Sequence, residues 1–285
     1  MKKHKSTILL LSLFLVGLAV LLYPSVSNYL NQIDATRAVN SYDASVKNLT
    51  QTDYDEIFAA AQAYNAEISG SEQEFYGGAP HDSEYASLLN INGDGMIGYV
   101  TIKKLNVQLP IYHGTDDEIL KMGAGHLEGS SLPVGGAYTH AVITGHRGLP
   151  AAKLFTDLDK MEVGDTFKLT VLNKTMTYQV DKISIVDPGD TDNLEIKDGG
   201  DYVTLLTCTP YGINTQRLLV HGVRTDNPSD EIVLADAYQI DPVIVSPIVA
   251  APMLTILLII FLVRTSGKKQ GGSSTKTRNR RKEDK

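Results

Sequence analysis

The chain has 285 residues, of which 26 are basic and 33 acidic, with 42% hydrophobic residues and a single cysteine, Cys208. This hydrophobic fraction excludes disorder throughout, and one cysteine excludes both an internal disulfide framework and a cysteine-rich zinc site. The charge is uneven: residues 24–263 carry 14 basic and 31 acidic residues, a net charge of −17 that argues against nucleic acid as a partner.

Two uncharged segments predict membrane spans. Residues 7–23 form a run of 17, and residues 242–263 a run of 22, against the roughly 20 apolar residues that cross a bilayer core. The first follows three lysines within residues 1–6, and the second is followed by a basic tail over 264–285. Basic flanks remain cytoplasmic, so we expect both ends in the cytoplasm and the middle outside the cell membrane.

An alternative for residues 7–23 is a cleaved signal peptide, with the small residues Ser25 to Ser27 as its cleavage site. Either interpretation exports the middle of the chain. The tail is polar, basic and rich in Gly and Ser, which is typical of a segment lying against anionic lipid headgroups. Nucleic-acid binding by the tail is the weaker alternative, because orientation in the membrane requires the same charges.

Residues 24–69 form the predicted helical segment of the exported part. Apolar residues recur at helical spacing from about Tyr29 to Ser69 and predict two helices broken near Asn48–Asp53. Thr52 or Asp53 is predicted to cap the second helix. A loop rich in Gly, Pro and Asp follows over residues 70–95, with one helical turn expected at Glu84–Leu89.

From residue 96 to 228 the pattern changes to short β runs bounded by turn residues. The runs are MIGYVTI, VQLPIYH, HAVITGH, TFKLTVL, KTMTYQVDKISIV, YVTLLTC and RLLVHGVR. Short helical inserts are expected at Asp116–Lys121 and Ala151–Leu158. Seven or eight short strands predict a mainly β fold, a closed or nearly closed barrel, joined to the second span by a linker over residues 229–241.

Cys208 is the first candidate for chemistry. A lone cysteine is often a buried, inert thiol, but an exported thiol meets oxidising conditions, and Cys208 follows a β run where its side chain can reach the barrel rim. Arg217 lies nine residues on, where the chain returns into the next strand. Its positive charge there would stabilise a thiolate and the oxyanion of a tetrahedral intermediate.

A cysteine nucleophile also needs a proton donor and acceptor. His146 ends a β run between Gly145 and Gly148, which places it at a rim, whereas His140 lies at the opposite end of the same run. His221 is expected to be a surface or packing residue. These residues predict an exported thiol acyltransferase or peptidase.

The same residues carry a resemblance to the sortase family. The run TLLTC ends at Cys208, with Arg217 downstream and Gly145-His146 upstream, and resembles the sortase signature. Residues 207–220, TCTPYGINTQRLLV, are similar to the proline-containing motif of class C, pilus-building sortases. Further similar strings are PIYHG at 110–114, GHLEGSSLP at 125–133 and THAVITGHRGLP at 139–150.

The resemblance implies a sortase-type eight-stranded barrel with catalytic residues His146, Cys208 and Arg217. It implies that Cys208 attacks an LPxTG-like sorting motif and that a lysine of another pilin subunit resolves the acyl-enzyme. Thr207 and Thr209, which flank the cysteine, are expected to help hold substrate or oxyanion. No metal or organic cofactor is expected; the expected partners are pilin subunits and the membrane.

One departure from class C concerns the segment over the active site. Class C sortases usually carry a lid with an Asp-Pro-aromatic tripeptide, which Gly70–Leu89 lacks. We hypothesise a looser lid, in which His81, Asp82 or Tyr85 replaces the usual contacts. The alternative is an unstructured linker that never covers the cysteine.

Two other functions remain open. A wall-anchoring sortase would use the same residues but a cell-wall peptide amine as acceptor. A non-catalytic assembly module would use the barrel only as a binding surface.

Overall fold

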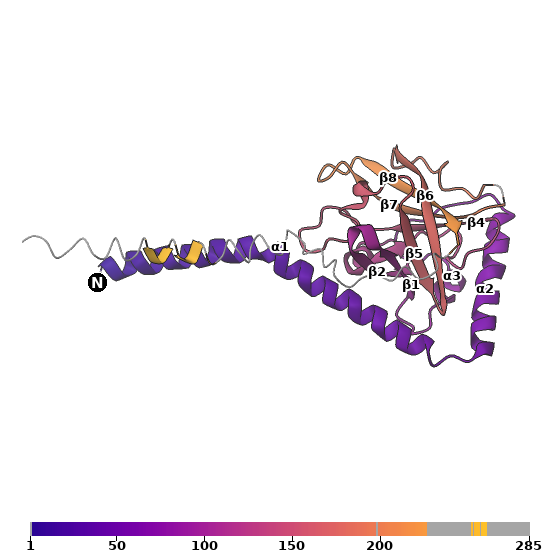
Figure 1. Cartoon of the computed structure of the whole chain (residues 1–285), viewed down its shortest axis with the longest axis horizontal. Helices are drawn as coiled ribbons and strands as arrows, with labels where there is room; N and C mark the ends of the chain where they lie inside the picture. The colour runs from indigo at the N-terminus through magenta and orange to yellow at the C-terminus, as the bar shows by residue number, and fades with distance from the viewer. Residues whose placement is uncertain (1, 198, 227–251, 253, 257, 261–285) are drawn as a thin grey trace, which may run out of the picture. The chain divides into compact units, whose positions relative to one another are not determined.

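The computed structural model describes residues 2–197, 199–226, 252, 254–256 and 258–260. Its residues from Tyr23 to Asp226 belong to one compact unit. The first helix, α1, spans Lys2–Val46 and so begins before this unit. The elements that follow are α2 (Gln51–Ser69), α3 (Ser83–Ser87), β1 (Met96–Ile102), η1 (Lys103–Leu105), β2 (Val107–His113), α4 (Asp117–Met122), β3 (Ala124–His126), β4 (Thr139–Thr144), η2 (Leu158–Lys160), β5 (Thr166–Val171), β6 (Lys174–Val186), β7 (Asp201–Thr209) and β8 (Gln216–Thr225). Figure 1 labels most of them.

The eight strands close into a barrel in the order β1-β2-β3-β4-β7-β8-β6-β5. The predicted mainly β, closed eight-stranded fold is therefore confirmed. Neighbouring strands run antiparallel except for β2–β3 and β4–β7, which are parallel. The parallel pair β4–β7 matters for function, because both strands then end at the same edge of the barrel.

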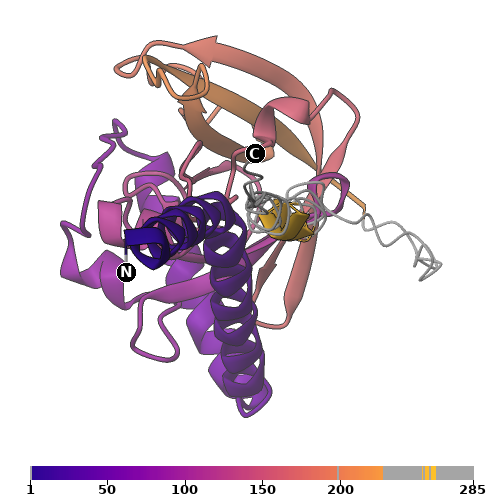
Figure 2. The same ribbon diagram turned by 90° about the vertical axis from the view of Figure 1, so that its left-hand side faces the viewer.

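Residues 23–69 form helices that lie against the outside of the barrel (Figure 1), and Figure 2 shows the same arrangement from the side. Tyr42 of α1 is fully buried, and its hydroxyl donates to the Ile97 carbonyl and accepts from the Leu172 N–H, both at 2.9 Å. Phe58 and Ala61 of α2 pack into the same core. The two helices are thus an integral part of the packing of the barrel unit.

The predicted break between the helices is confirmed, but the predicted cap is wrong. Thr50 is the N-cap of α2, and its hydroxyl accepts from the Asp53 N–H while the Asp53 carboxylate accepts from the Thr50 N–H at 2.7 Å. The helix therefore begins earlier than Thr52 or Asp53. Asp53 acts as the reciprocal partner in the capping box rather than as the cap.

The predicted helix at Ala151–Leu158 is also wrong. This segment forms turns and then η2. Leu154 has a φ of 39°, a left-handed conformation that cannot continue a right-handed helix. The segment is held by short turn bonds, such as Thr156 N–H to the Lys153 carbonyl at 2.8 Å, and by the Phe155 N–H, which donates to the His146 carbonyl at 3.1 Å.

Among the described residues, α1 is the one helix long and apolar enough to cross a membrane. It continues through Pro24, so the predicted span and the first predicted helix are one continuous helix. Proline removes one backbone hydrogen bond without obliging the helix to end. The second predicted span, residues 242–263, the linker at 229–241 and the tail at 264–285 lie almost entirely outside the described residues.

Candidate active site

Cys208 and Arg217 lie directly opposite each other on the antiparallel strands β7 and β8. Along β7, Val203, Leu205 and Thr207 are buried, while Cys208 is partly exposed on the alternate face. Directly opposed residues of an antiparallel pair project to the same side of the sheet. The thiol and the guanidinium therefore share the outer face of the barrel.

His146 lies two residues beyond β4, beside the same end of β7. In the parallel β4–β7 pair, Thr144 is opposite Leu206. Hydrogen bonding continues past β4: the Gly145 N–H donates to the Leu206 carbonyl at 3.0 Å, and the Thr207 hydroxyl donates to the Gly145 carbonyl at 2.7 Å. Extending this register by two residues aligns His146 with Cys208.

Gly145 permits this close packing. A Cβ at this position would lie 2.5 Å from an atom of the Phe155 ring, well inside van der Waals contact. Phe155 belongs to the loop that returns beneath His146. The glycine before the histidine is thus required by the fold of the loop that supports it.

His146 has an acidic neighbour that the sequence analysis missed. Its Nε2 lies 3.3 Å from a carboxylate oxygen of Asp117, at the start of α4. Hydrogen bonds from Lys121 and then from His146 hold the pKa of Asp117 below its usual value. A pair of acidic residues opening the predicted insert at 116–121 was the available signal, but nothing local pointed from it to His146.

Arg217 keeps its charge available. Its guanidinium donates to the carbonyls of Gln216, at 3.1 Å, and Asn214, at 3.4 Å. Within the described part of the chain it forms no ion pair with a carboxylate. A partly exposed, uncompensated guanidinium opposite the thiol can interact with a developing oxyanion.

The side chains of Thr207 and Thr209 point away from this face. Both are buried; Thr207 bonds to Gly145, and the Thr209 hydroxyl accepts from Arg147 at 3.0 Å. The expectation that these hydroxyls contact substrate is therefore not supported by the geometry.

The segment predicted as a lid is folded onto the barrel. Glu128 accepts hydrogen bonds from the N–H groups of His81, at 2.6 Å, and Asp82, at 2.9 Å. Asp82 caps α3, and His81 stacks on Tyr76 with ring centroids 5.1 Å apart. An unstructured linker is thus not what the structure contains.

Tyr85 is a core residue. It is fully buried, its hydroxyl lies 2.8 Å from Nδ1 of His126, and burial raises its pKa. None of the described hydrogen bonds, ion pairs or ring contacts of His81, Asp82 and Tyr85 reaches His146, Cys208 or Arg217. The three named lid contacts therefore anchor the segment rather than cover the thiol.

Another residue of the segment does reach the outer face. Phe75 packs on a small apolar cluster formed by Val142, Leu194 and Leu219, and Leu206 packs on the same cluster. Leu206 lies two positions before Cys208 and on the same face of β7. Phe75 thus packs on the same cluster as a residue two positions before Cys208 on the thiol's face of β7.

The other histidines lie elsewhere. His140 is buried at the start of β4, with Nδ1 donating to the Glu195 carbonyl at 2.9 Å and Nε2 accepting from the Thr204 hydroxyl at 2.8 Å. His221 is paired with Asp181 at 2.5 Å. In the described residues no group of three or more His, Cys, Asp or Glu side chains is arranged to hold a metal ion.

Comparisons with known proteins agree on one family. Residues 100–225 match the family model of the sortase domain. The structure is similar to sortase C1 of Streptococcus agalactiae, with 47% identity and a TM-score of 0.64 over 67% of this chain and 99% of that one. It is also similar to a sortase C of Streptococcus pneumoniae, whose structure was described as informative on catalysis and pilin substrate specificity, with 45% identity and a TM-score of 0.63 over 67% and 97% of the two chains.

More distant relatives are similar over a shorter stretch. Sortase D of Bacillus subtilis is 32% identical over 130 residues, and sortase A of Streptococcus agalactiae is 31% identical over 130 residues. Each match covers 45% of this chain, and the chain spans 63% and 52% of the two relatives. The chain thus spans less than two thirds of the length of these curated relatives.

Proposed function

The chain belongs to the sortase family, as a class C member, and on that premise we propose that it is a cysteine transpeptidase that joins pilin subunits. The observation that carries the proposal is the outer face of the barrel. There a partly exposed thiol lies opposite a guanidinium that has no carboxylate partner among the described residues. The register of β4 and β7 aligns a histidine with the thiol.

In the first half-reaction the Cys208 thiolate attacks the Thr–Gly carbonyl of an LPxTG-like motif. The tetrahedral oxyanion forms next to Arg217, which stabilises it. His146, as imidazolium, gives a proton to the leaving glycine amine as the C–N bond breaks. The product is a thioester between the threonine carbonyl and Cys208, with His146 left neutral.

In the second half-reaction a lysine amine of the next pilin subunit attacks the thioester. Neutral His146 takes the proton from that amine, the C–S bond breaks, and the thiolate is restored. An isopeptide bond joins the two subunits. One residue thus serves first as acid and then as base, so the cycle consumes no net proton.

The apolar helix α1 fits a membrane anchor for this activity. We propose that the barrel acts on the outer side of the membrane with both ends of the chain in the cytoplasm, as the basic flanks indicate. Substrates that arrive with membrane anchors of their own would then meet the enzyme at a raised effective concentration.

Intact mass tests the proposal directly. The full chain in detergent would be incubated with an LPxTG-type peptide, beside Cys208→Ala. A hydroxylamine-labile adduct on the unchanged chain alone, with the mass of the peptide cleaved after Thr, is the expected result. Absence of an adduct on both chains, with the thiol shown by alkylation to be reactive, would favour the non-catalytic module.

The acceptor separates the two enzymatic alternatives. Once the adduct forms, a lysine-containing pilin peptide and a cell-wall peptide amine would be offered in turn. Class C membership favours release by the lysine. Release by the wall peptide alone would indicate a wall-anchoring enzyme.

We further predict that Phe75 limits access to the thiol. Phe75→Ala removes the ring packed beside the cluster of Val142, Leu194 and Leu219. These contacts are worth about 1 kcal/mol, and losing them should increase the fraction of molecules in which the segment has moved off the barrel face. Peptide cleavage at low substrate concentration should then rise about five-fold. The measurement is the initial rate of cleavage.

The control for Phe75→Ala is Tyr138→Ala, which removes an exposed aromatic ring outside this cluster. Its rate should equal that of the unchanged chain. An unchanged rate in Phe75→Ala would show that the segment does not act as a lid. Deleting residues 70–89 is a poorer test, because it removes the core residue Tyr85.

A further inference from the structure

Arg147, the residue after His146, is a buried cation with no role in the reaction as described so far. Its side chain is only 7% exposed. A guanidinium is rarely buried unless each of its donors is bound, because removing it from water is costly. The groups that Arg147 binds therefore indicate which parts of the structure it holds together.

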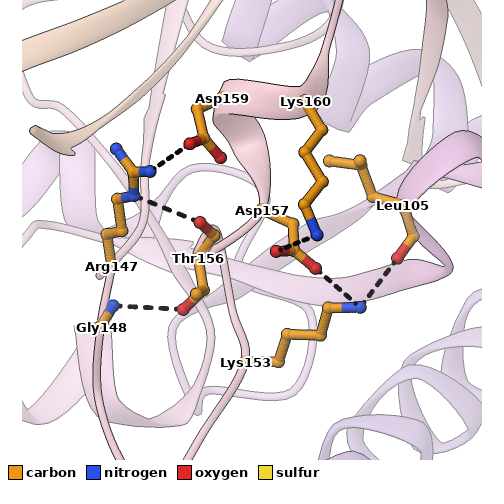
Figure 3. Close-up of polar contacts among 8 residues, drawn as sticks. All are labelled: Leu105, Arg147, Gly148, Lys153, Thr156, Asp157, Asp159 and Lys160. Atoms are coloured by element: carbon orange, nitrogen blue, oxygen red, sulfur yellow. Dashed lines mark hydrogen bonds and ion pairs between the residues drawn. The ribbon is translucent and has the colours of Figure 1, made fainter. Parts of the chain in front are cut away.

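The donors of Arg147 bind different segments of the chain. Nη1 donates to the Thr209 hydroxyl at 3.0 Å, at the end of β7. Nε donates to the Thr156 carbonyl at 3.2 Å, and Nη2 pairs with Asp159. Figure 3 shows the last two contacts, with the guanidinium facing the loop of residues 153–160.

The same loop also holds the backbone on both sides of Arg147. The Phe155 N–H donates to the His146 carbonyl at 3.1 Å, and the Gly148 N–H donates to the Thr156 hydroxyl at 3.1 Å. The far side of the loop is fixed in turn, because Lys153 binds both the Leu105 carbonyl and Asp157 (Figure 3). The peptide that carries His146 is therefore supported by an anchored loop.

One side chain consequently connects both reactive residues. Arg147 is covalently attached to His146, and it is hydrogen-bonded to Thr209, which is covalently attached to Cys208. We propose that Arg147 is a positioning residue that fixes the separation of the His146 imidazole and the Cys208 thiol. The proposal rests on the transpeptidase function above, which makes that separation matter.

The effect should be on turnover. A misplacement of about 1 Å between reacting groups costs on the order of 100-fold in rate. Arg147→Met removes all the bonds while keeping much of the apolar bulk, so kcat for peptide cleavage should fall about 30-fold, with KM changed by less than about two-fold. Arg147→Lys should fall at least about 10-fold, because an ammonium cannot reproduce the planar, divergent donors.

The bond to Thr209 can be tested alone. Thr209→Val keeps the shape of the side chain and removes the hydroxyl that accepts from Arg147. We expect a loss in kcat of about five-fold, and no further loss when it is combined with Arg147→Met, because the bond is already gone. Full additivity of the two changes would overturn the proposal.

Lys160→Met is the matched control. Lys160 lies on the same loop, pairs with Asp157 at 2.8 Å and has a side chain that is 64% exposed. Its replacement removes a positive charge from the loop without touching the bonds of Arg147, so kcat should stay within about two-fold. A loss in Lys160→Met equal to that in Arg147→Met would show a general charge effect and contradict positioning.

All rates would be divided by the concentration of thiol that forms thioester in a single turnover, in the full chain in detergent. A purely structural role lowers that concentration or the unfolding midpoint but leaves kcat per thioester unchanged, which would overturn the proposal. Should Arg147→Met not fold, Thr209→Val decides the question by itself. If the unchanged chain forms no thioester, the proposed function fails; if it does and the variants match its kcat, only the positioning role fails.

Discussion

Replacing Cys208 by alanine is expected to reduce peptide cleavage and transpeptidation at least 1,000-fold, to the background rate. Cys208 is the only thiol in the chain, so no neighbouring residue can form the thioester in its place. Removing the nucleophile of a comparable acyl-transfer site costs on the order of a million-fold in kcat. The measurement is single-turnover cleavage of an LPxTG-type peptide.

The loss should not be additive with the loss of its proton-transfer partner. His146→Ala alone is expected to cost about 100- to 10,000-fold, the usual contribution of a general acid and base. In Cys208→Ala/His146→Ala the rate should equal that of Cys208→Ala, because the histidine has no covalent intermediate to serve. If Cys208→Ala kept a rate above background and the double variant lost it, His146 would act outside the thioester pathway.

Cys208→Ser gives a second comparison. A serine hydroxyl is far less acidic than a thiol, and the opposing Arg217 charge cannot make it an alkoxide at neutral pH, so this variant should also be inactive. Measurable cleavage by Cys208→Ala would overturn the nucleophile assignment and move the non-catalytic module forward.

Much of the barrel could be predicted because apolar and polar residues alternate along its longer strands. Runs such as MIGYVTI and TFKLTVL have the β-branched and aromatic composition and period of half-buried strands, and they correspond to β1 and β5. Strand β3 could not be predicted. It has three residues, Ala124 to His126, with a glycine at its centre, so it has neither the length nor the composition of a strand, and only its partners β2 and β4 define it.

The site, too, was predictable where it depends on neighbouring residues in the sequence and not where it depends on distant ones. The opposition of Cys208 and Arg217 follows from a short hairpin, which is local information. The approach of Asp117 to His146 and the burial of Tyr85 against His126 depend on residues 29 and 41 positions apart. Side chains that meet across such distances leave no pattern in a single sequence. The sequence therefore suggests His81, Asp82 and Tyr85 as lid contacts, whereas in the structure they anchor the segment.

Buried histidines also give this fold a dependence on pH that the reaction does not require. Three are buried among the described residues, and burial lowers the pKa of each, His113 included. Burial lowers the pKa of His126 to about 3 and that of His140 to about 4, from an ordinary value near 6.5. Their hydrogen bonds hold both rings neutral. His126 donates to the Ser131 carbonyl and accepts a hydrogen bond from the Tyr85 hydroxyl. His140 donates to the Glu195 carbonyl and accepts a hydrogen bond from the Thr204 hydroxyl. Protonation in the folded state would break the accepting contact.

Stability should therefore fall as the pH is lowered below about 6.5. In that range the unfolded chain binds a proton at each histidine while the folded chain does not, so the free energy of unfolding decreases until the folded pKa values are reached. At pH 5 His126 and His140 each account for about 2 kcal/mol, and His113 adds to the same effect. The free energy of unfolding measured with urea should therefore be at least about 4 kcal/mol lower at pH 5 than at pH 7.5. Aspartates with lowered pKa values, such as Asp165 and Asp53, lose their contribution to folding stability only when the pH falls toward 3.8 and below.

Two variants isolate the histidine contribution. His140→Gln should lower stability at pH 7.5 but reduce the difference between pH 7.5 and pH 5 by about 2 kcal/mol, because one titrating group is gone. Thr204→Val removes the hydroxyl that donates a hydrogen bond to His140 and leaves the imidazole buried. This variant should destabilise the protein but keep most of the difference in stability between pH 7.5 and pH 5. If His140→Gln left the difference unchanged, the acid sensitivity would have to come from other groups, because the removed imidazole was the only titrating group that differed between the two chains.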